Sequence, residues 1–358
     1  MSDLQFEQVA NIKVFGIGGA GGNAVNRMVN EGVKGVEFYV ANTDLQVLNR
    51  SAVENKIVLG REVTRGLGAG GDPEVGRKAA QENESEIREA MKDADMVFIT
   101  AGLGGGTGTG AAPLFAKIAK EEGALTVGIV TKPFSFEGRK RFESATSGLS
   151  ELRQYVDSLI IVSNNNLLEV IGRKPVGEAF EAADNVLRQG VQTITDLIAV
   201  PAMINLDFAD VRSVMENQGS ALIGIGMAEG DDKARAAAEK AIQSPLLEAQ
   251  ITGAKNAIIN VTGGENITLY DADDAAAYIR EAAGNEIDTI FGVAINKNLG
   301  DAIIVTVIAT GFDETANDPK TATTLRSAAV KKEPVRNSAP SRSIEDLDDG
   351  GIPNFFKH

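Results

Sequence analysis

The segment Gly104-Gly105-Gly106-Thr107-Gly108-Thr109-Gly110 decides how this chain is interpreted. It lies between an apolar run at residues 96–100 and a helix-forming segment at residues 111–122, which predicts a strand, a glycine loop and a helix. Glycines let successive backbone N–H groups turn toward one point, and a helix N-terminus adds partial positive charge there. The two threonines add hydroxyl donors, and Pro113 fits a first helical turn, so the arrangement suits a polyphosphate. A flexible linker is disfavoured, because linkers are not usually flanked by a buried strand and an amphipathic helix.

Two further glycine-rich turns follow predicted strands, Gly16-Ile17-Gly18-Gly19-Ala20-Gly21 and Gly66-Leu67-Gly68-Ala69-Gly70-Gly71. The first matches G-x-G-x-x-G, which alone would suggest an NAD-linked oxidoreductase. A dinucleotide site uses one such loop and an acidic residue for a ribose, whereas three glycine loops here imply several phosphates. The sequence contains no G-x-x-x-x-G-K-[ST] motif, so backbone dipoles, hydroxyls and metal must meet the phosphate charge.

Continuous apolar strands alternate with helices through the first half of the chain. Strands that are apolar on both faces predict a parallel sheet covered on two sides, with ligands bound at the carboxyl ends of the strands. All the glycine loops lie at those ends. The strands are expected at residues 12–18, 36–43, 56–59, 96–100, 125–130 and 159–162, with helices at 74–92, after an Asp72 cap, and at 137–155.

The second half begins with a long helix. Apolar residues recur at helical spacing over residues 175–199, which predicts a helix that leaves the first domain and lies against a second one. The last two strands are separated by Asn298-Leu299-Gly300-Asp301, which predicts a hairpin and a mixed or antiparallel second sheet. Further helices are expected at residues 207–216, 232–243 and 271–283, and strands at 221–227, 257–262, 288–296 and 302–310.

The composition limits the available chemistry. The sequence has no cysteine, and His358 is its only histidine, which excludes thiol nucleophiles and cysteine zinc sites and leaves a hard cation such as Mg²⁺ the most compatible metal. The net charge of −15 argues against direct nucleic-acid binding. No apolar run reaches the roughly 18 residues that span a bilayer, and residues 1–11 lack signal-peptide features, so we expect a cytoplasmic protein without direct membrane insertion.

The C-terminal segment changes character twice. Residues 313–343 are poor in large apolar residues and rich in mixed charge and proline, which predicts a disordered linker. Residues 344–358 then restore hydrophobicity with Ile352, Phe355 and Phe356. Apolar residues after a solvated linker indicate a short peptide that orders on a partner, although a frayed terminus has the same composition.

The three loops in this order resemble the tubulin/FtsZ superfamily, and within it the FtsZ family of bacterial cell-division proteins. The resemblance covers about residues 12–312 with seven nucleotide-proximal loops, and the tail is similar to the family's docking peptide. It implies an α/β fold in which a Rossmann-like parallel-sheet GTP-binding domain and a long central helix precede an α+β domain with a mixed sheet. The expected divisions are a flexible N-terminus at 1–11, a GTP-binding domain at 12–174, the central helix at 175–201, a GTPase-activating domain at 202–312, the linker at 313–343 and the docking peptide at 344–358.

The same resemblance implies the residues that bind GTP and GDP. Mg²⁺ is expected to bind mainly through the phosphates, without protein ligands, and the sequence leaves a K⁺ requirement open. The implied nucleotide residues are Gly18, Gly19, Ala20, Gly21, Gly22, Asn23, Arg27, Asn42, Asp44, Gly68, Ala69, Gly70, Gly102, Gly104, Gly105, Gly106, Thr107, Gly108, Thr109, Gly110, Thr131, Pro133, Glu137, Arg141, Asn164, Phe180 and Asp184.

Several of these residues can be assigned chemistry. A carboxylate can accept both donors of the guanine edge, and the resemblance gives this role to Asp184, with Phe180 against the base. Glu137 and Arg141 match ribose-side and phosphate-side contacts, yet their i, i+4 spacing also fits a plain surface ion pair. Asn164 matches a family asparagine, although the family more often has Pro-Asn-Asp around it.

The acidic segment Asn205-Leu206-Asp207-Phe208-Ala209-Asp210 carries the expected catalytic residues, Asn205, Asp207 and Asp210. Two carboxylates at i and i+3 on a helix start share one face, where they could polarise a water or position a cation. An N-cap aspartate beside a solvated acid is the plainer interpretation of such a pair. In the family this loop meets the GTP of the next subunit, so hydrolysis requires a head-to-tail contact that builds filaments.

The resemblance therefore implies a self-assembling GTPase of the bacterial division ring. Its filaments would lie beneath the membrane at mid-cell, held by membrane adaptors that bind residues 344–358. An oxidoreductase that uses Gly16–Gly21, and a scaffold that binds nucleotide without hydrolysis, are the alternatives. The acidic pair argues against the scaffold.

Overall fold

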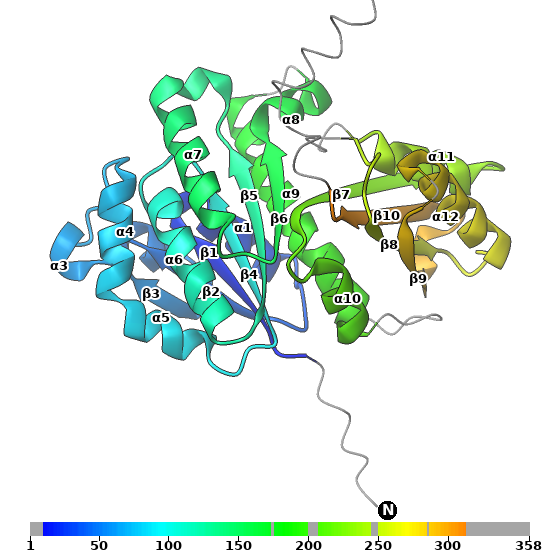
Figure 1. Ribbon diagram of the computed structural model, residues 1–358. Coiled ribbons are helices and arrows are strands. Elements are labelled where there is room, and N and C mark those ends of the chain that lie inside the picture. Colours follow the sequence, from blue (N-terminus) through cyan, green and yellow to red (C-terminus); the bar gives the residue numbers. More distant parts are fainter. Residues whose placement is uncertain (1–9, 173–174, 200–206, 245–249, 285, 313–358) are drawn as a thin grey trace, which may run out of the picture. The chain divides into compact units, whose positions relative to one another are not determined.

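One ten-stranded sheet runs through the described part of the chain (Figure 1), in the order β3-β2-β1-β4-β5-β6-β7-β10-β8-β9. The computed structural model describes residues 10–172, 175–199, 207–244, 250–284 and 286–312. The strands are β1 (Ile12–Ile17), β2 (Glu37–Asn42), β3 (Asn55–Val58), β4 (Met96–Gly102), β5 (Leu125–Lys132), β6 (Ser158–Ser163), β7 (Gly219–Ala228), β8 (Asn256–Gly263), β9 (Asp288–Ile295) and β10 (Ile303–Thr310).

Helices connect most of these strands and cover both faces of the sheet. The helices are α1 (Gly18–Asn30), α2 (Leu45–Arg50), α3 (Arg61–Thr64), α4 (Pro73–Glu82), α5 (Glu84–Met91), α6 (Thr107–Glu121), α7 (Arg139–Leu152), α8 (Asn164–Ile171), α9 (Val176–Ala199), α10 (Phe208–Met215), α11 (Lys233–Ile242) and α12 (Leu269–Ala283), with short 3-10 helices η1 (Ser135–Glu137) and η2 (Lys297–Leu299).

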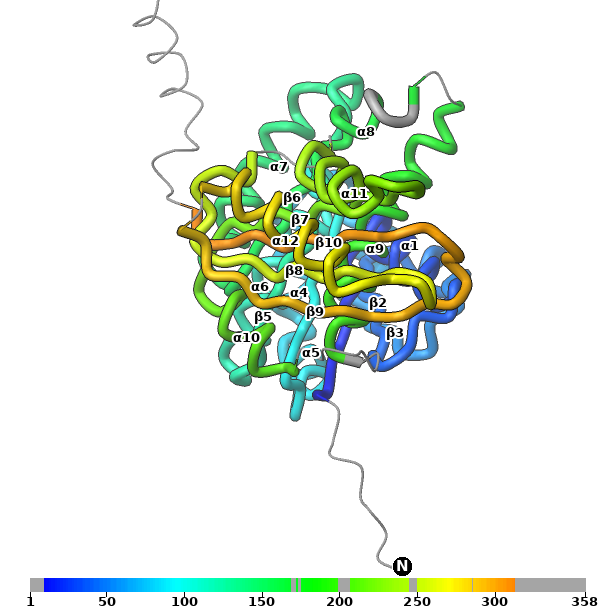
Figure 2. Tube along the Cα trace, turned by 90° about the vertical axis from the view of Figure 1, so that its right-hand side faces the viewer, coloured from blue at the N-terminus to red at the C-terminus, as the bar shows by residue number. Residues whose placement is uncertain are grey.

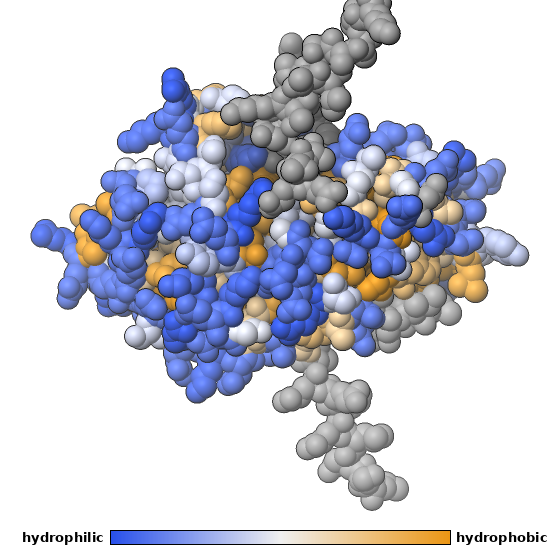
Figure 3. Space-filling model, in the orientation of Figure 1, coloured by the Kyte–Doolittle hydropathy of each residue, from blue (hydrophilic) through white to orange (hydrophobic). Residues whose placement is uncertain are grey.

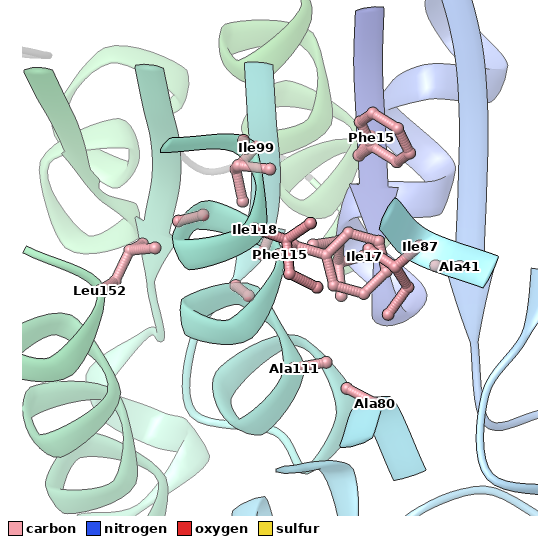
Figure 4. Packing of buried hydrophobic residues seen from close by; sticks show 14 of the residues in the cluster. Phe15, Ile17, Ala41, Ala80, Ile87, Ile99, Ala111, Phe115, Ile118 and Leu152 are labelled. Carbon is pink, nitrogen blue, oxygen red and sulfur yellow. The ribbon is translucent and has the colours of Figure 1, made fainter. Parts of the chain in front are cut away.

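Strands β1 to β6 are all parallel, as the continuous apolar runs predicted. Successive residues of each strand point to opposite faces, so each strand supplies two hydrophobic cores. On one face, Val14 and Phe98 pack with apolar residues of α1, α9 and α10. On the other, Phe15 and Ile99 pack with residues of α4, α5, α6 and α7, and Figure 4 shows Phe115 of α6 among them. The ends of the strands are thereby fixed between two helical layers.

The second half continues the same sheet rather than forming a separate one. Strand β7 pairs in parallel with β6 over three residue pairs, Ser158–Gly219 to Ile160–Ala221. Strand β10 is antiparallel to both β7 and β8, while β8 and β9 are parallel, so this part is mixed as predicted. Helices α11 and α12 close a third core over it.

The predicted hairpin between the last two strands is wrong. Strand β8 lies between β9 and β10, so these two strands do not pair. The connection begins with the N–H of Asn296 bonded to the carbonyl of Gly263 at 2.8 Å, which carries the chain across the end of β8. Adjacency in sequence predicted pairing here, but the connection is longer than a tight hairpin turn.

Two helix boundaries also differ from prediction. Helix α6 begins at Thr107 inside the glycine segment, so Pro113 lies within the helix and not in its first turn. The helix expected at residues 74–92 is divided into α4 and α5 at Asn83. Asp72 caps α4 as predicted, accepting the N–H of Glu74 at 2.9 Å, with Pro73 in the first helical position.

Several expectations concern residues outside the described ones. They are the flexible N-terminus apart from residues 10 and 11, Pro201 at the end of the central helix, the linker at 313–343 and the docking peptide at 344–358. No described helix is long and apolar enough to cross a membrane. The face shown in Figure 3 is hydrophilic over most of its area, with smaller apolar patches among the hydrophilic residues.

Asp157, the residue directly before β6, joins the two halves of the sheet. Its carboxylate is buried, accepts the N–H of Thr126 at 2.9 Å and lies 3.2 Å from the ammonium of Lys120. Its backbone carbonyl accepts the N–H of Gly219 at 2.9 Å, where β7 begins. One residue therefore holds β5, β6, β7 and α6 together.

We expect Asp157→Ala to lower the free energy of unfolding by about 2–3 kcal/mol, because the buried N–H of Thr126 loses its acceptor. Urea unfolding measures the change. The exposed Glu54→Ala is the matched control. A loss no larger than that of the control would contradict the proposed role.

Candidate nucleotide-binding site

A cleft of about 230 Å³ opens where β4, β5 and β6 end. Its lining comes from segments far apart in the sequence, and every lining residue except Leu103 and Ala183 was predicted from the sequence. The lining residues are Gly19, Ala20, Gly102, Leu103, Gly105, Gly106, Thr107, Gly108, Thr131, Pro133, Glu137, Arg141, Asn164, Phe180, Ala183 and Asp184.

Two helices begin at this cleft without a side-chain cap. Helix α1 has Ile17 at its N-cap and α6 has Gly106, and neither N-cap side chain accepts a backbone N–H. By contrast, Asp72 caps α4 and Thr268 caps α12. The first N–H groups of α1 and α6 are therefore available to an anion, and the helix dipoles favour negative charge there.

The glycines of the cleft do two different things. A Cβ at Gly21 would overlap the carbonyl of Thr100, and one at Gly108 would lie 2.8 Å from the carbonyl of Gly102, so these positions need glycine for close packing. A Cβ at Gly19 or Gly105 would meet no atom within 4 Å, and both residues line the cleft. The space beside these two glycines is where a ligand could approach the backbone.

Thr109 is placed beneath the central loop and not in the cleft. It is buried, and its hydroxyl accepts the N–H of Gly104 at 2.8 Å. Gly104 has a φ of 101°, which favours glycine, and the bond to Thr109 holds that turn. Thr109 therefore shapes the loop, whereas Thr107 at the first turn of α6 reaches the cleft wall.

Other predicted nucleotide residues lie beside the cleft and do not line it. Gly18, Gly22 and Asn42 border a smaller neighbouring hollow. Asp44 is the N-cap of α2 and accepts the N–H of Gln46 at 2.9 Å, which gives it a structural role. The remaining ones outside the lining are Gly21, Asn23, Arg27, Gly68, Ala69, Gly70, Gly104, Thr109 and Gly110.

The third glycine loop packs against the central loop. Ala69 is buried, and a Cβ added at Gly106 would lie 2.7 Å from the Ala69 Cβ. Gly106 must therefore stay a glycine for the two loops to meet. The third loop supports the central loop from outside the cleft.

Another part of the cleft lining carries an aromatic side chain, Phe180, and an amide side chain, Asn164. Phe134 and Phe180 meet edge to face with ring centroids 5.2 Å apart, and Phe180 is 41% exposed. Asn164 is buried, and its Oδ1 has no hydrogen-bond partner among the described residues. A buried acceptor without a donor fits a ligand that brings an N–H group. Glu137 forms an ion pair with Arg141, which was the alternative to nucleotide contacts, and both residues also line the cleft.

Asp184, on α9, has an unusual acidity. Burial raises its pKa to about 7 from an ordinary 3.8, Arg27 opposes the rise, and Glu181 adds to it. Because the folded-state pKa is raised, the stability that Asp184 contributes is fully present below pH 3.8 and is lost as the pH rises through about 7. Burial therefore favours a protonated carboxyl, and a ligand that donates hydrogen bonds to Asp184 must favour its ionised form.

The predicted catalytic pair lies away from the cleft. Asp207 is the N-cap of α10, accepting the N–H of Asp210 at 2.9 Å, and Asp210 accepts the N–H of Asp207 at 3.2 Å. In the single chain, the two residues thus form a reciprocal capping box. This agrees with the plainer interpretation of the pair, in which one aspartate is an N-cap. Neither residue lines the cleft, and Asn205 lies outside the described residues.

Helix α10 lies at the far end of the sheet from the cleft. Ser158, which begins β6, donates its hydroxyl to the carbonyl of Met215 in α10 at 2.6 Å, whereas Asn164, directly after β6, lines the cleft. The six residues of β6 carry the chain from Ser158 to Asn164, a rise of about 20 Å. Figures 1 and 2 both show α8, which Asn164 begins, and α10 at opposite ends. One molecule therefore cannot bring its acidic pair to its own cleft.

Comparison with known proteins identifies the class. Residues 11–172 match the model of the Tubulin/FtsZ family, GTPase domain, and residues 219–313 match the FtsZ family, C-terminal domain. The fold and the cleft thus define a nucleotide-binding GTPase of the tubulin/FtsZ class.

Solved structures identify the family to which the chain belongs within this class. An empty FtsZ dimer from M. jannaschii is 44% identical to the chain, with a TM-score of 0.81, covering 86% of this chain and 90% of that one. CetZ1 from Haloferax volcanii, a GDP-bound monomer, is 20% identical with a TM-score of 0.76, covering 89% of this chain and 98% of that one, and shows the shared fold. The chain belongs to the FtsZ family. It is an FtsZ-family GTPase of the cell-division cytoskeleton, which removes the oxidoreductase and non-hydrolysing alternatives.

We expect guanine-nucleotide binding to depend on the protonation of Asp184. Because the pKa of Asp184 is about 7, GDP should bind roughly tenfold more weakly at pH 6 than at pH 8, since a protonated carboxyl cannot accept both guanine donors. Calorimetric titration across this range measures the effect. Asp184→Asn should remove it, and Asp196→Asn on the same helix should leave it. Identical pH profiles in all three proteins would contradict the assignment.

Proposed function

We propose that this GTPase hydrolyses GTP at the junction between subunits stacked head to tail in filaments. The separation of the acidic pair from the cleft is the observation that carries the proposal. A cleft that lacks its own catalytic carboxylates is completed only when the α10 end of another copy reaches it. Such a contact is heterologous and does not close, so it repeats into a filament.

The cleft supplies the binding half of this junction. Phosphates would lie against the uncapped N-termini of α1 and α6, beside the open backbone of Gly19 and Gly105. The guanine would lie at the other end, with its donors on Asp184 and its ring near Phe180. Asn164 would meet the base with its unpartnered oxygen.

A magnesium ion would be held at this cleft mainly by the phosphates of the bound nucleotide and not by protein side chains. Among the described residues, no cluster of three or more acidic or histidine side chains could hold a metal. The uncapped backbone N–H groups are donors and cannot ligate a cation, so phosphate oxygens and water must supply most of the ligands. Bound in this way, Mg²⁺ would neutralise charge as the γ-phosphate leaves.

The acidic pair supplies the catalytic half. Phosphoryl transfer to water needs positioning and charge stabilisation more than a covalent nucleophile. Asp207 and Asp210, with Asn205 before them, would orient a water in line with the γ-phosphate of the neighbouring subunit. The water oxygen bonds to the γ-phosphorus as the bond to the β–γ bridging oxygen breaks, which gives GDP, phosphate and a proton.

The self-association of a relative supports the first part of this proposal, that copies of the chain associate. The M. jannaschii FtsZ structure is a dimer, and CetZ2 from Haloferax volcanii, 20% identical with a TM-score of 0.75, is a GTPγS-bound protofilament, covering 89% of this chain and 97% of that one. We extend self-association to this chain on its 44% identity to FtsZ. Filaments would gather at mid-cell in the cytoplasm, held beneath the membrane by adaptors that bind residues 344–358.

Asp210→Asn should assemble with GTP yet hydrolyse it about 100-fold more slowly. The amide oxygen can still accept the N–H of Asp207 and complete the capping box of α10, but the charge that orients the water is lost. Phosphate release recorded together with light scattering measures both properties. Asp271→Asn, which alters the equivalent capping box of α12, should leave turnover unchanged.

Mixing tests whether the site is shared. Asp210→Asn keeps a working cleft, and Gly105→Leu should block the cleft while keeping the acidic pair. Junctions that join the two variants can hydrolyse GTP, so the mixture should be more active than either protein alone. Turnover at a fixed rate per molecule in dilute, monomeric protein would contradict catalysis between subunits.

Removal of residues 344–358 should separate assembly from placement in the cell. GTP turnover should stay at the full-length level, because the cleft and the acidic pair are intact. The fluorescently labelled truncated chain should lose its mid-cell position in dividing cells. Normal placement of the truncated chain would show that the tail does not bind the adaptors.

A further inference from the structure

Thr43 was not predicted as a site residue, although it stands between Asn42 and Asp44, which were. It directly follows β2 and is fully buried. Its hydroxyl oxygen lies 2.7 Å from that of Thr107, the first residue of α6. Thr107 lines the cleft, so Thr43 stands immediately behind a residue of the cleft wall.

We propose that Thr43 is a positioning residue that orients the Thr107 hydroxyl toward a phosphate. Thr43 donates its hydroxyl hydrogen to Thr107, and Thr107 then donates its own hydrogen into the cleft. The inference rests on the proposed function, because it requires a phosphate beside the N-terminus of α6.

Hydrogen-bond accounting gives the direction. A hydroxyl has one hydrogen to donate and two lone pairs to accept, whereas an ionised phosphate oxygen only accepts. From the distance between the two oxygens alone, either threonine could be the donor. Once a phosphate faces Thr107, its single hydrogen is needed there, and the short contact between the threonines persists only if Thr43 donates. Without Thr43, a lone pair of Thr107 could face the phosphate and repel it.

The backbone of Thr43 extends this link to the third glycine loop. Its carbonyl accepts the N–H of Gly68 at 3.1 Å and the hydroxyl of Thr64 at 3.3 Å. Next to it, Leu45 donates its N–H to Gly66 at 3.1 Å. The same residue thus holds the central loop through its side chain and the third loop through its backbone, which fixes both against the phosphate position.

The test compares Thr43→Val with Thr43→Ser in the full chain. Affinities are measured by calorimetry for guanosine, GMP, GDP and a non-hydrolysable GTP analogue. Valine keeps the shape of threonine and removes its hydroxyl. Each ligand in the series that has the phosphate contacted by Thr107 should therefore bind about five- to tenfold more weakly, and the affinity for guanosine should not change. Serine should restore the affinity. Thr310→Val is the control, since Thr310 is equally buried and its hydroxyl donates to Val214 at 2.7 Å, outside the cleft.

A double-mutant comparison checks the coupling. If Thr43 acts through Thr107, the Thr43→Val change should weaken binding little further in a Thr107→Val protein. An equal loss for guanosine and for GDP, or additive losses in the double variant, would overturn the inference. Failure of the unmodified chain to bind GDP would overturn the proposed function itself. Normal binding by the unmodified chain and by Thr43→Val would overturn only the role of Thr43.

Discussion

Repulsion between an acidic protein and an acidic ligand is the constraint that shapes this structure. The chain carries a net charge of −15 and no lysine-bearing phosphate loop, so oriented backbone dipoles must supply much of the attraction for a nucleotide. The uncapped N-termini of α1 and α6 provide them at one sheet edge. Their position depends on glycines such as Gly21 and Gly108, where any side chain would strike neighbouring backbone.

The continuous sheet separates the two chemical functions. One end of β6 leads into the cleft at Asn164, and the other is bonded to α10 through Ser158. Because β7 continues the sheet beside β6, the second half is held at a fixed distance from the cleft in the same molecule. The rigidity that orders the binding site is what excludes the acidic pair from it.

The sequence predicted the parallel sheet, the long helix α9 and most of the cleft lining, since apolar runs and glycine turns are local patterns. It failed where the outcome depended on tertiary contacts. Strand β8 between β9 and β10 cannot be read from the turn that joins them, and the start of α6 was hidden by glycines that usually break helices. Leu103 and Ala183 carry no chemical signal. Thr43 sits in an Asn-Thr-Asp run at the end of a strand, a polar signal that could have drawn attention to it.

The position of the capping box of α10 also determines when hydrolysis can begin. In a lone molecule, Asp207 and Asp210 are occupied with each other's backbone N–H groups. On the proposed assignment, a free copy diffuses through the cell with its GTP intact, and hydrolysis to GDP starts only after it joins a neighbour. Older junctions would then hold GDP and recent ones GTP. The bound nucleotide would therefore distinguish older segments of a polymer from newer ones.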